Sequence, residues 1–280
     1  MVRSDQQAVV NVDGHEIAYR RAGQGPALVL LHGFLCDSRV WRTQLSALSG
    51  NHTVIAWDAP GAGLSSDPVS SFTIQEWALV LAAFLDTVGI DRAHVLGLSW
   101  GGLLAQEYYR LRESRVLTLI LADTYAGWKG SLGAPAAAQR LERCIRESSL
   151  PPADFVARWV PKEFFTDNAP RAVVEEMSAV VSGLHPAGFR LMAASLALAD
   201  TTALLPRIAV PTLLLWGEGD RRSPLTVAES FRAAIPSARL EVIPGAGHVS
   251  NMERPDAFNE RVLQFLALAD RSRSHVGGAD

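Results

Sequence analysis

Cysteine is scarce in this chain. The 280 residues include only Cys36 and Cys144. Two cysteines cannot build the disulfide framework of a small secreted domain, and their wide separation does not match the close spacing of a zinc-binding motif. No other pattern in the sequence indicates a metal ion, so we expect no metal site.

Long apolar runs and an excess of basic side chains are also missing. The longest apolar run, residues 78–85, is far shorter than the roughly 20 residues that cross a membrane. The formal net charge is −3, which disfavours nucleic acid and anionic membrane surfaces as partners.

The amino-terminal residues lack the basic and apolar segments of a signal peptide, so we expect a cytoplasmic protein. The sequence gives no indication of the oligomeric state.

Predicted strands alternate with predicted helices over most of the chain. Hydrophobic residues make up 48% and charged residues 20%, which is the balance of a soluble globular protein. Apolar runs and turn signals predict eight strands, at residues 7–12, 15–22, 27–31, 52–57, 93–98, 116–122, 210–216 and 239–243. Helices are expected near residues 38–48, 73–88, 101–109, 224–235 and 256–269. This alternation predicts an α/β fold, with a mostly parallel sheet covered by helices on both faces.

The alternation breaks between residues 124 and 205. This segment contains helical patterns and prolines but no convincing strand. We interpret it as a helical cap inserted into a core formed by residues 1–123 and 206–269. The last residues, 270–280, are polar and rich in glycine, and we expect them to be disordered.

The pentapeptide Gly97-Leu98-Ser99-Trp100-Gly101 stands between a predicted strand and a predicted helix. A serine on such a sharp turn sits in a strained backbone position with its hydroxyl exposed above the sheet. Side chains at residues 97 and 101 would collide with the neighbouring strand and helix, which explains the glycines. Ser99 is therefore a candidate nucleophile.

A serine hydroxyl needs a base, because it is a poor nucleophile while neutral. His248 is the candidate, in a glycine-rich loop after the last strand, where open α/β sheets place their chemistry. A carboxylate must in turn orient the imidazole. Asp220, which follows the strand at residues 210–216, is the preferred acid. Asp123 is the alternative because it ends the strand after the Ser99 helix, and Glu218 is a weaker alternative.

Two backbone amides are expected to bind the negative oxygen that forms during attack on a carbonyl. One belongs to Trp100, directly after the nucleophile. The other belongs to Phe34, in the His32-Gly33-Phe34 loop that follows the strand at residues 27–31. These two amides form the predicted oxyanion hole.

The motifs together resemble the α/β-hydrolase superfamily. They are His32-Gly33-Phe34, Asp58-x-x-Gly61-x-Gly63-x-Ser65, Gly97-x-Ser99-x-Gly101-Gly102, Trp216-Gly217-x-x-Asp220 and Gly247-His248. The layout is similar to small-cap carboxylesterases and 3-oxoadipate enol-lactonase-like hydrolases. This resemblance implies an α/β-hydrolase fold with an eight-stranded sheet and an inserted cap. It also implies cofactor-independent cleavage of a small-molecule ester or lactone by a Ser-His-Asp triad through an acyl-enzyme.

The cap is expected to shape the substrate pocket. Its large apolar residues favour an apolar substrate portion, although many of them must simply pack the cap onto the core. The pocket candidates are Trp128, Trp159, Phe164, Leu184 and Met192. Arginines recur at residues 140, 143 and 146, and we interpret them as a solvated helix face, with binding of a carboxylate as the alternative.

Other functions fit the same motifs. A C–C bond hydrolase, an amidase or peptidase, and a cofactor-free perhydrolase can all use the same triad, because pocket contacts decide the reaction. A small-molecule receptor that has kept the triad is a further alternative.

Overall fold

Eight strands form one sheet at the centre of the molecule, as expected. A computed structural model describes residues 6–68 and 71–276, with side chains described as far as residue 271. The strand order across the sheet is β1-β2-β4-β3-β5-β6-β7-β8. The strands are β1 (Gln6–Val12), β2 (His15–Ala22), β3 (Ala27–Leu31), β4 (Thr53–Trp57), β5 (Ala93–Leu98), β6 (Val116–Ala122), β7 (Thr212–Gly217) and β8 (Ala238–Ile243).

The burial of each strand explains its place in the sheet. Every residue of β3, β4, β5, β6 and β7 is buried, as continuous apolar runs covered on both faces should be. These strands pair in parallel, and β8 joins them at one edge. The β1–β2 hairpin turns at Asp13-Gly14 and pairs antiparallel with β4 at the other edge.

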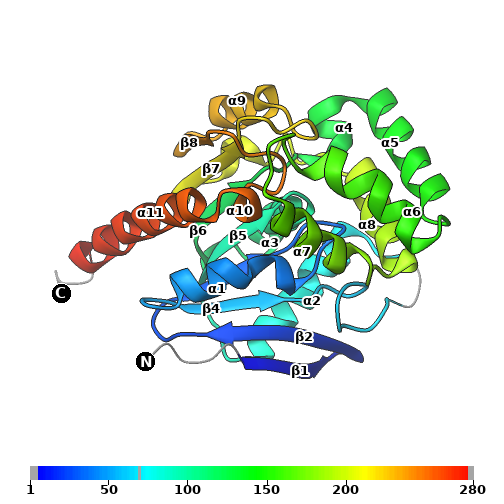
Figure 1. Cartoon of the computed structure of the whole chain (residues 1–280). Helices are drawn as coiled ribbons and strands as arrows, with labels where there is room; N and C mark the ends of the chain where they lie inside the picture. Colours follow the sequence, from blue (N-terminus) through cyan, green and yellow to red (C-terminus); the bar gives the residue numbers. More distant parts are fainter. Residues whose placement is uncertain (1–5, 69–70, 277–280) are drawn as a thin grey trace.

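Helices cover both faces of the sheet (Figure 1). Helices α1 (Arg42–Leu48) and α11 (Pro255–Val276) pack together on one face, and α2 (Ile74–Thr87) and α3 (Trp100–Leu111) pack on the other. Helix α9 (Leu225–Ala234) packs on β7 and β8, and the short α10 (Ser250–Glu253) precedes α11. No helix within the described residues combines the length and the apolar character that a membrane span needs.

The segment between β6 and β7 forms helices that gather beside one end of the sheet, in green and yellow in Figure 1. Residues 124–205 are all described and contain no strand. We keep them as the proposed cap, and residues 1–123 and 206–269 as the proposed core. The segment holds α4 (Gly127–Leu132), α5 (Ala134–Glu147), α6 (Pro152–Trp159), the π-helix η3 (Val160–Phe164), α7 (Arg171–Val181) and α8 (Pro186–Leu198), followed by a short 3₁₀ helix, η4 (Leu205–Arg207).

The Trp100 side chain ties this segment to the core. Its indole Nε1 donates a hydrogen bond to Ser195 Oγ on α8, at 2.9 Å. The ring also packs edge-on against Trp77 of α2, with the centroids 5.2 Å apart. The residue after Ser99 therefore uses its side chain to hold α8 in place.

Helix α11 is longer than expected. A disordered tail was expected from residue 270, but the helix continues to Val276. Asp270 on this helix lies against His52 and His94, and these contacts give the residues beyond 269 a fixed partner in the core. Residues 277–280 of the expected tail lie outside the described residues.

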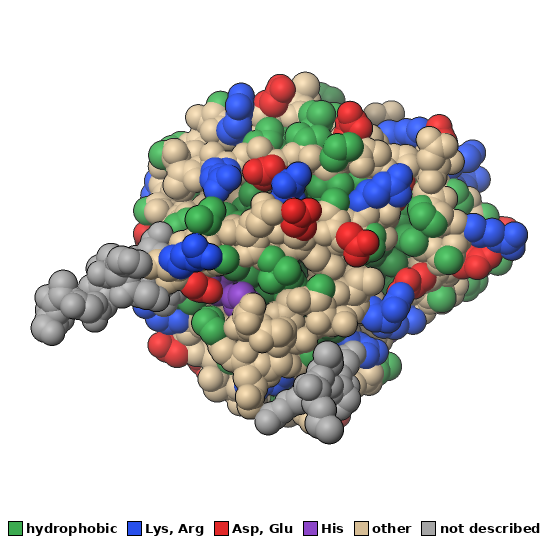
Figure 2. All heavy atoms as spheres, turned by 60° about the vertical axis from the view of Figure 1, so that its left-hand side comes forward, with side chains coloured by type: hydrophobic (Ala, Val, Ile, Leu, Met, Phe, Trp, Pro, Cys, Tyr) green, Lys and Arg blue, Asp and Glu red, His purple; other side chains and the backbone are tan. Residues whose placement is uncertain are grey.

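Acidic and basic side chains are interspersed on the face shown in Figure 2. Hydrophobic groups lie between them, and neither sign of charge gathers into one large area of that view. This distribution agrees with the small net charge of −3.

The turn at Ser99 depends on close approaches that only glycine permits. Ser99 has φ 54° and lies between β5 and α3. A Cβ atom on Gly97 would lie 2.2 Å from the carbonyl oxygen of Gly101, and one on Gly101 would lie 2.1 Å from that of Leu31. Both obstacles are backbone atoms, so a side chain at either position would push the strand and the helix apart.

We expect Gly101→Ala to lower the free energy of unfolding by about 3 kcal/mol, because it overpacks a site where only backbone can give way. Urea unfolding followed by circular dichroism measures this loss. Gly50→Ala is the matched control, since an added Cβ there meets no atom within 4 Å. Equal stability of the two variants would contradict the steric explanation.

Candidate active site

Ser99 meets an imidazole from the far end of the chain. His248 lies in the loop between β8 and α10, and its Nε2 is 2.8 Å from Ser99 Oγ. Both residues are buried, with 4% of Ser99 and 1% of His248 exposed. A neutral imidazole at this distance can accept the hydroxyl proton and so activate the serine.

Asp220 contacts the opposite side of the imidazole. It follows β7, and its Oδ2 lies 2.8 Å from His248 Nδ1. Its other oxygen, Oδ1, accepts backbone hydrogen bonds from Arg222 at 2.8 Å and from Ser223 at 2.9 Å. These amides orient the carboxylate toward His248, which keeps the proton on Nδ1 and leaves Nε2 as the acceptor.

Asp123 and Glu218, the alternative acids, contact other groups. Asp123 Oδ1 accepts a hydrogen bond from Gly217 N at 2.7 Å, and Ser250 Oγ donates to Oδ2 at 2.5 Å. Burial, and then the negative charge of Asp220, raise the pKa of Asp123 well above its ordinary value. Glu218 accepts a hydrogen bond from Gly245 N at 3.0 Å. The structure thus places Asp220, and not the alternatives, against the imidazole.

The two expected oxyanion donors belong to segments that adjoin Ser99. A Cβ added to Gly33 would lie 3.5 Å from Ser99 Cβ, so the loop after β3 passes beside the serine. Phe34 is the next residue of that loop. Trp100 opens α3, and the first amides of a helix have no acceptor within it. Both segments adjoin Ser99, and the oxyanion hole formed by the two amides stays a prediction.

Three of the expected pocket residues meet this site. Trp128 and Trp159 face the Phe34 ring edge-on, with ring centroids 6.0 and 6.1 Å away. Phe164 stacks on the His248 imidazole at 6.1 Å. Aromatic rings from residues 124–205 thus pack against Phe34 and His248.

The other two expected pocket residues lie elsewhere in the cap. Met192 is fully buried in α8, and its carbonyl accepts a hydrogen bond from the Ser195 hydroxyl. Leu184 is half-buried in the turn between α7 and α8, beside Gly183, which packs near Arg39. No described contact joins either side chain to Ser99 or His248.

Arg222 is a neighbour of the site that the sequence analysis missed. Only 5% of this residue is exposed, and its guanidinium lies over the rings of Phe34 and Trp159, at 5.4 and 5.3 Å from their centroids. Its Nη1 donates a hydrogen bond to Glu163 at 2.8 Å. In the sequence, the pair Arg221-Arg222 resembles two exposed basic residues. The one signal for a place at the site is that the pair directly follows Asp220.

The interpretation of the α5 arginines as a solvated face was wrong for two of the three. Arg140 donates hydrogen bonds to Tyr125 Oη and to the Arg222 carbonyl, both at 3.0 Å. Arg143 lies over the Trp159 ring, 4.6 Å from its centroid. Arg146 is exposed and pairs with Glu142 on the same helix. Helix α5 directs Arg140 and Arg143 toward the site, because aromatic rings there attract their guanidinium groups.

Glu253 was also missed, and it positions the His248 loop. This residue is buried, with 2% of its surface exposed. Its carboxylate accepts hydrogen bonds from Gly247 N at 2.8 Å and from Thr166 N at 3.2 Å. These hydrogen bonds join Gly247, the residue before His248, to Thr166 in the segment that follows η3. Nothing in the local sequence distinguishes Glu253 from an exposed acidic residue.

The expectation of no metal site overlooked one cluster. Among the described residues, one group of side chains could hold a metal ion. It consists of His52, His94 and Asp270. These residues lie at the amino ends of β4 and β5 and on α11, away from Ser99. The triad itself needs no metal for the proton transfers described above.

Comparisons with known proteins agree with this geometry. A family model described as the alpha/beta hydrolase family matches residues 28–261. The chain is 30% identical to 3-oxoadipate enol-lactonase 2 of Acinetobacter baylyi over 248 residues, which cover 87% of this chain and 90% of that protein. It is 29% identical over 256 residues to a protein of Pseudomonas savastanoi pv. phaseolicola provisionally named carbamate hydrolase RutD, covering 90% of this chain and 98% of that one.

A solved structure is similar along nearly the whole chain. The thermophilic esterase of Thermogutta terrifontis superposes with a TM-score of 0.86 at 28% identity, covering 94% of this chain and 99% of the esterase. The eight-stranded sheet with its flanking helices is therefore the fold of that esterase, as the sequence motifs predicted.

We expect His248 to titrate below the ordinary histidine pKa of about 6.5. Burial is the main influence and lowers the pKa of His248, while Asp220 partly offsets it. Asp220→Asn removes that offset and should lower the pKa further. Nitrogen-15 NMR of labelled histidine measures both midpoints. A His248 midpoint above 6.5, or a rise in the variant, would contradict this assignment.

Proposed function

The chain belongs to the α/β-hydrolase family, and on that premise we propose that it is a serine hydrolase that cleaves a carboxylic ester or lactone of a small, largely apolar molecule. One observation carries the proposal. Ser99 Oγ, His248 and Asp220 form a continuous chain of contacts, each 2.8 Å long. Two segments that can supply oxyanion amides adjoin the same serine. No cofactor is needed for the steps that follow.

The first half of the reaction forms an acyl-enzyme. Nε2 of His248 takes the proton from Ser99 Oγ as the oxygen attacks the substrate carbonyl. The carbonyl oxygen becomes negative and accepts hydrogen bonds from the amides of Phe34 and Trp100. Asp220 stabilises the imidazolium through Nδ1. The tetrahedral intermediate then collapses, and His248 returns the proton to the departing alcohol oxygen.

The second half releases the acid. Water takes the place of the alcohol, and Nε2 of His248 removes its proton during attack on the acyl carbon. The same amides hold the second oxyanion, and collapse returns the proton to Ser99 Oγ. For a lactone the alcohol stays attached to the acyl group, so a single hydroxy acid leaves the site.

The residues around the site favour an uncharged, apolar substrate. Phe164 stacks on the His248 imidazole, and Trp128 and Trp159 pack against the Phe34 ring in the loop beside Ser99. Arg222 brings a positive charge over Phe34, and Glu163 pairs with it and with Arg143, both at 2.8 Å. The similarity to an esterase and an enol-lactonase supports an ester or lactone bond.

A carbamate or amide bond is the second candidate, because the similar Pseudomonas protein carries a carbamate hydrolase name. The triad and the oxyanion donors would serve the same roles with a nitrogen leaving group. The bond cleaved then depends on whether His248 protonates an amine or an alcohol.

The proposal is tested with p-nitrophenyl esters of increasing acyl length, several lactones and simple carbamates. We expect turnover of esters or lactones that falls by about 10⁵-fold or more in Ser99→Ala, because the nucleophile is lost. Ser182→Ala, which changes an exposed serine on the cap, is the control and should keep full activity. Turnover that survives Ser99→Ala would refute the mechanism, and turnover of carbamates alone would favour the second candidate.

We expect the two buried acids to differ in their effect on catalysis. Asp220→Asn should lower kcat by roughly 10⁴-fold, because an amide at this position favours the wrong imidazole tautomer. Asp123→Asn should keep kcat within about tenfold of the parent, because Asp123 contacts Gly217 and Ser250 instead of His248. Steady-state kinetics on one active ester compares them. The reverse ranking would assign the acid to Asp123.

A further inference from the structure

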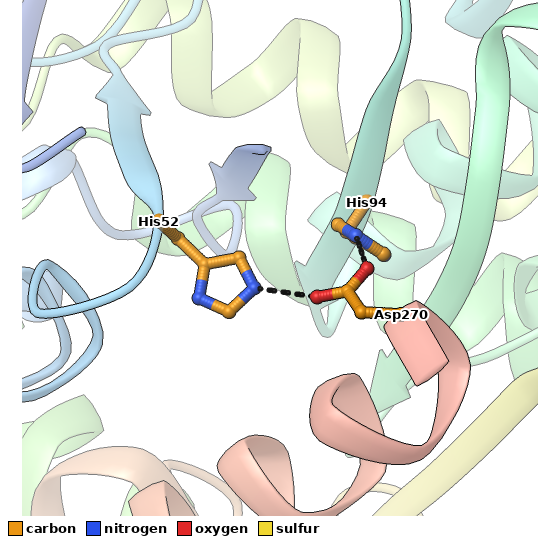
Figure 3. Close-up of side chains that lie close together, drawn as sticks. All are labelled: His52, His94 and Asp270. Atoms are coloured by element: carbon orange, nitrogen blue, oxygen red, sulfur yellow. Dashed lines mark ion pairs between the residues drawn. The ribbon is translucent and has the colours of Figure 1, made fainter. Parts of the chain in front are cut away.

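Three side chains from distant parts of the sequence converge at the end of the sheet opposite Ser99 (Figure 3). His52 directly precedes β4, His94 lies at the start of β5, and Asp270 projects from α11. The carboxylate of Asp270 points between the two imidazoles. Each residue offers one potential ligand atom, and these three atoms lie within 4.8 Å of one another.

The His52 ring is buried without adequate hydrogen bonding. Its side chain is 5% exposed and that of His94 is 0% exposed. Within the described part of the chain, His52 Nδ1 has no hydrogen-bond partner, and Nε2 has only the Asp270 carboxylate nearby. A buried polar group left in this state costs free energy unless another partner binds it.

The spacing of the cluster suits a shared cation better than direct hydrogen bonds. His52 Nε2 lies 3.4 Å from Asp270 Oδ2, and His94 Nε2 lies 3.2 Å from Asp270 Oδ1. Hydrogen bonds to a carboxylate are usually about 2.7–2.9 Å long. In a tetrahedral site with bonds of about 2.0–2.1 Å, the ligands stand roughly 3.3–3.4 Å apart. Small rotations of the rings would bring all three groups to that spacing.

A second contact orients one of the rings. His94 Nδ1 lies 2.9 Å from Thr118 Oγ1 on the neighbouring strand β6. This hydrogen bond leaves Nε2 directed at Asp270. Metal-binding histidines are held in the same way, since the nitrogen that does not bind the metal is fixed by a hydrogen bond that sets the ring orientation.

We propose that His52, His94 and Asp270 form a binding site for a divalent transition-metal cation, with zinc as the best match. Two imidazoles and one carboxylate suit zinc, whereas calcium and magnesium prefer oxygen ligands alone. Asp270 is 34% exposed, so solvent can reach the site and water can complete a tetrahedron.

The proposed role of this cation is structural. It joins α11, through Asp270, to the amino ends of β4 and β5, in addition to the packing of α11 on α1 and β8. His94 lies at the start of β5 and Ser99 directly follows the end of that strand, five residues later, which is about 16 Å of extended chain. Zinc at this site therefore stabilises the fold and takes no part in the chemistry at Ser99.

The first test is the binding of zinc to chelator-treated protein without an affinity tag. Equilibrium dialysis with metal analysis should find one zinc per chain. Zinc at about 100 times its dissociation constant should raise Tm by roughly 5 °C. Cobalt(II), used as a spectroscopic substitute, should show the visible absorption of a four-coordinate site. Absence of stoichiometric binding would overturn the proposal.

Variants locate the site. Asp270→Asn and His52→Gln, both checked for folding by circular dichroism, should each lose the Tm increase and weaken zinc binding at least tenfold. His185→Gln is the matched control because His185 also pairs with an aspartate, Asp67, at 2.7 Å, but lacks a second imidazole. His248→Gln removes the active-site imidazole and should keep full binding. Binding that persists in the first two variants, or that disappears in His248→Gln, would refute this location.

Discussion

The backbone of Ser99 is held at φ 54°, a conformation that costs a residue other than glycine about 1–3 kcal/mol. Neighbouring β6 stabilises it, because Ser99 N donates to the Ala122 carbonyl at 2.8 Å and Thr124 Oγ1 donates to the Ser99 carbonyl at 2.5 Å. The turn therefore stays rigid while the hydroxyl remains free to meet His248. The close packing at Gly97 and Gly101 follows from the same geometry.

The cap is connected to each loop that carries a functional group. The Trp100 indole holds α8 against the nucleophile turn. Arg222, next to the Asp220 loop, packs on Trp159 and pairs with Glu163. Glu253 links the loop of His248 to Thr166. Movement of the proposed cap would consequently disturb the segments that carry all three residues of the proposed triad.

Much of the fold could be predicted because buried parallel strands consist of continuous apolar residues, and residues 27–31 and 116–122 are examples. The order of Ser99, Asp220 and His248 also has a recognisable pattern. Arg222 has none, since burial of a guanidinium depends on rings contributed by a distant segment. Asp270 has no recognisable pattern either, because the polar residues around it in the sequence predicted a disordered tail. Its partners, His52 and His94, are brought to it by the sheet.

All seven tryptophans of the chain are fully buried. Their emission is consequently that of indoles shielded from water, and dissolved quenchers have poor access to them in the closed state. Trp100, Trp128 and Trp159 lie where the cap meets the core, and Trp159 has the guanidinium groups of Arg143 and Arg222 over its ring. The protein therefore carries an intrinsic optical reporter beside its proposed active site. A movement of the proposed cap would change the tryptophan fluorescence of the protein, so no added dye would be needed to detect it.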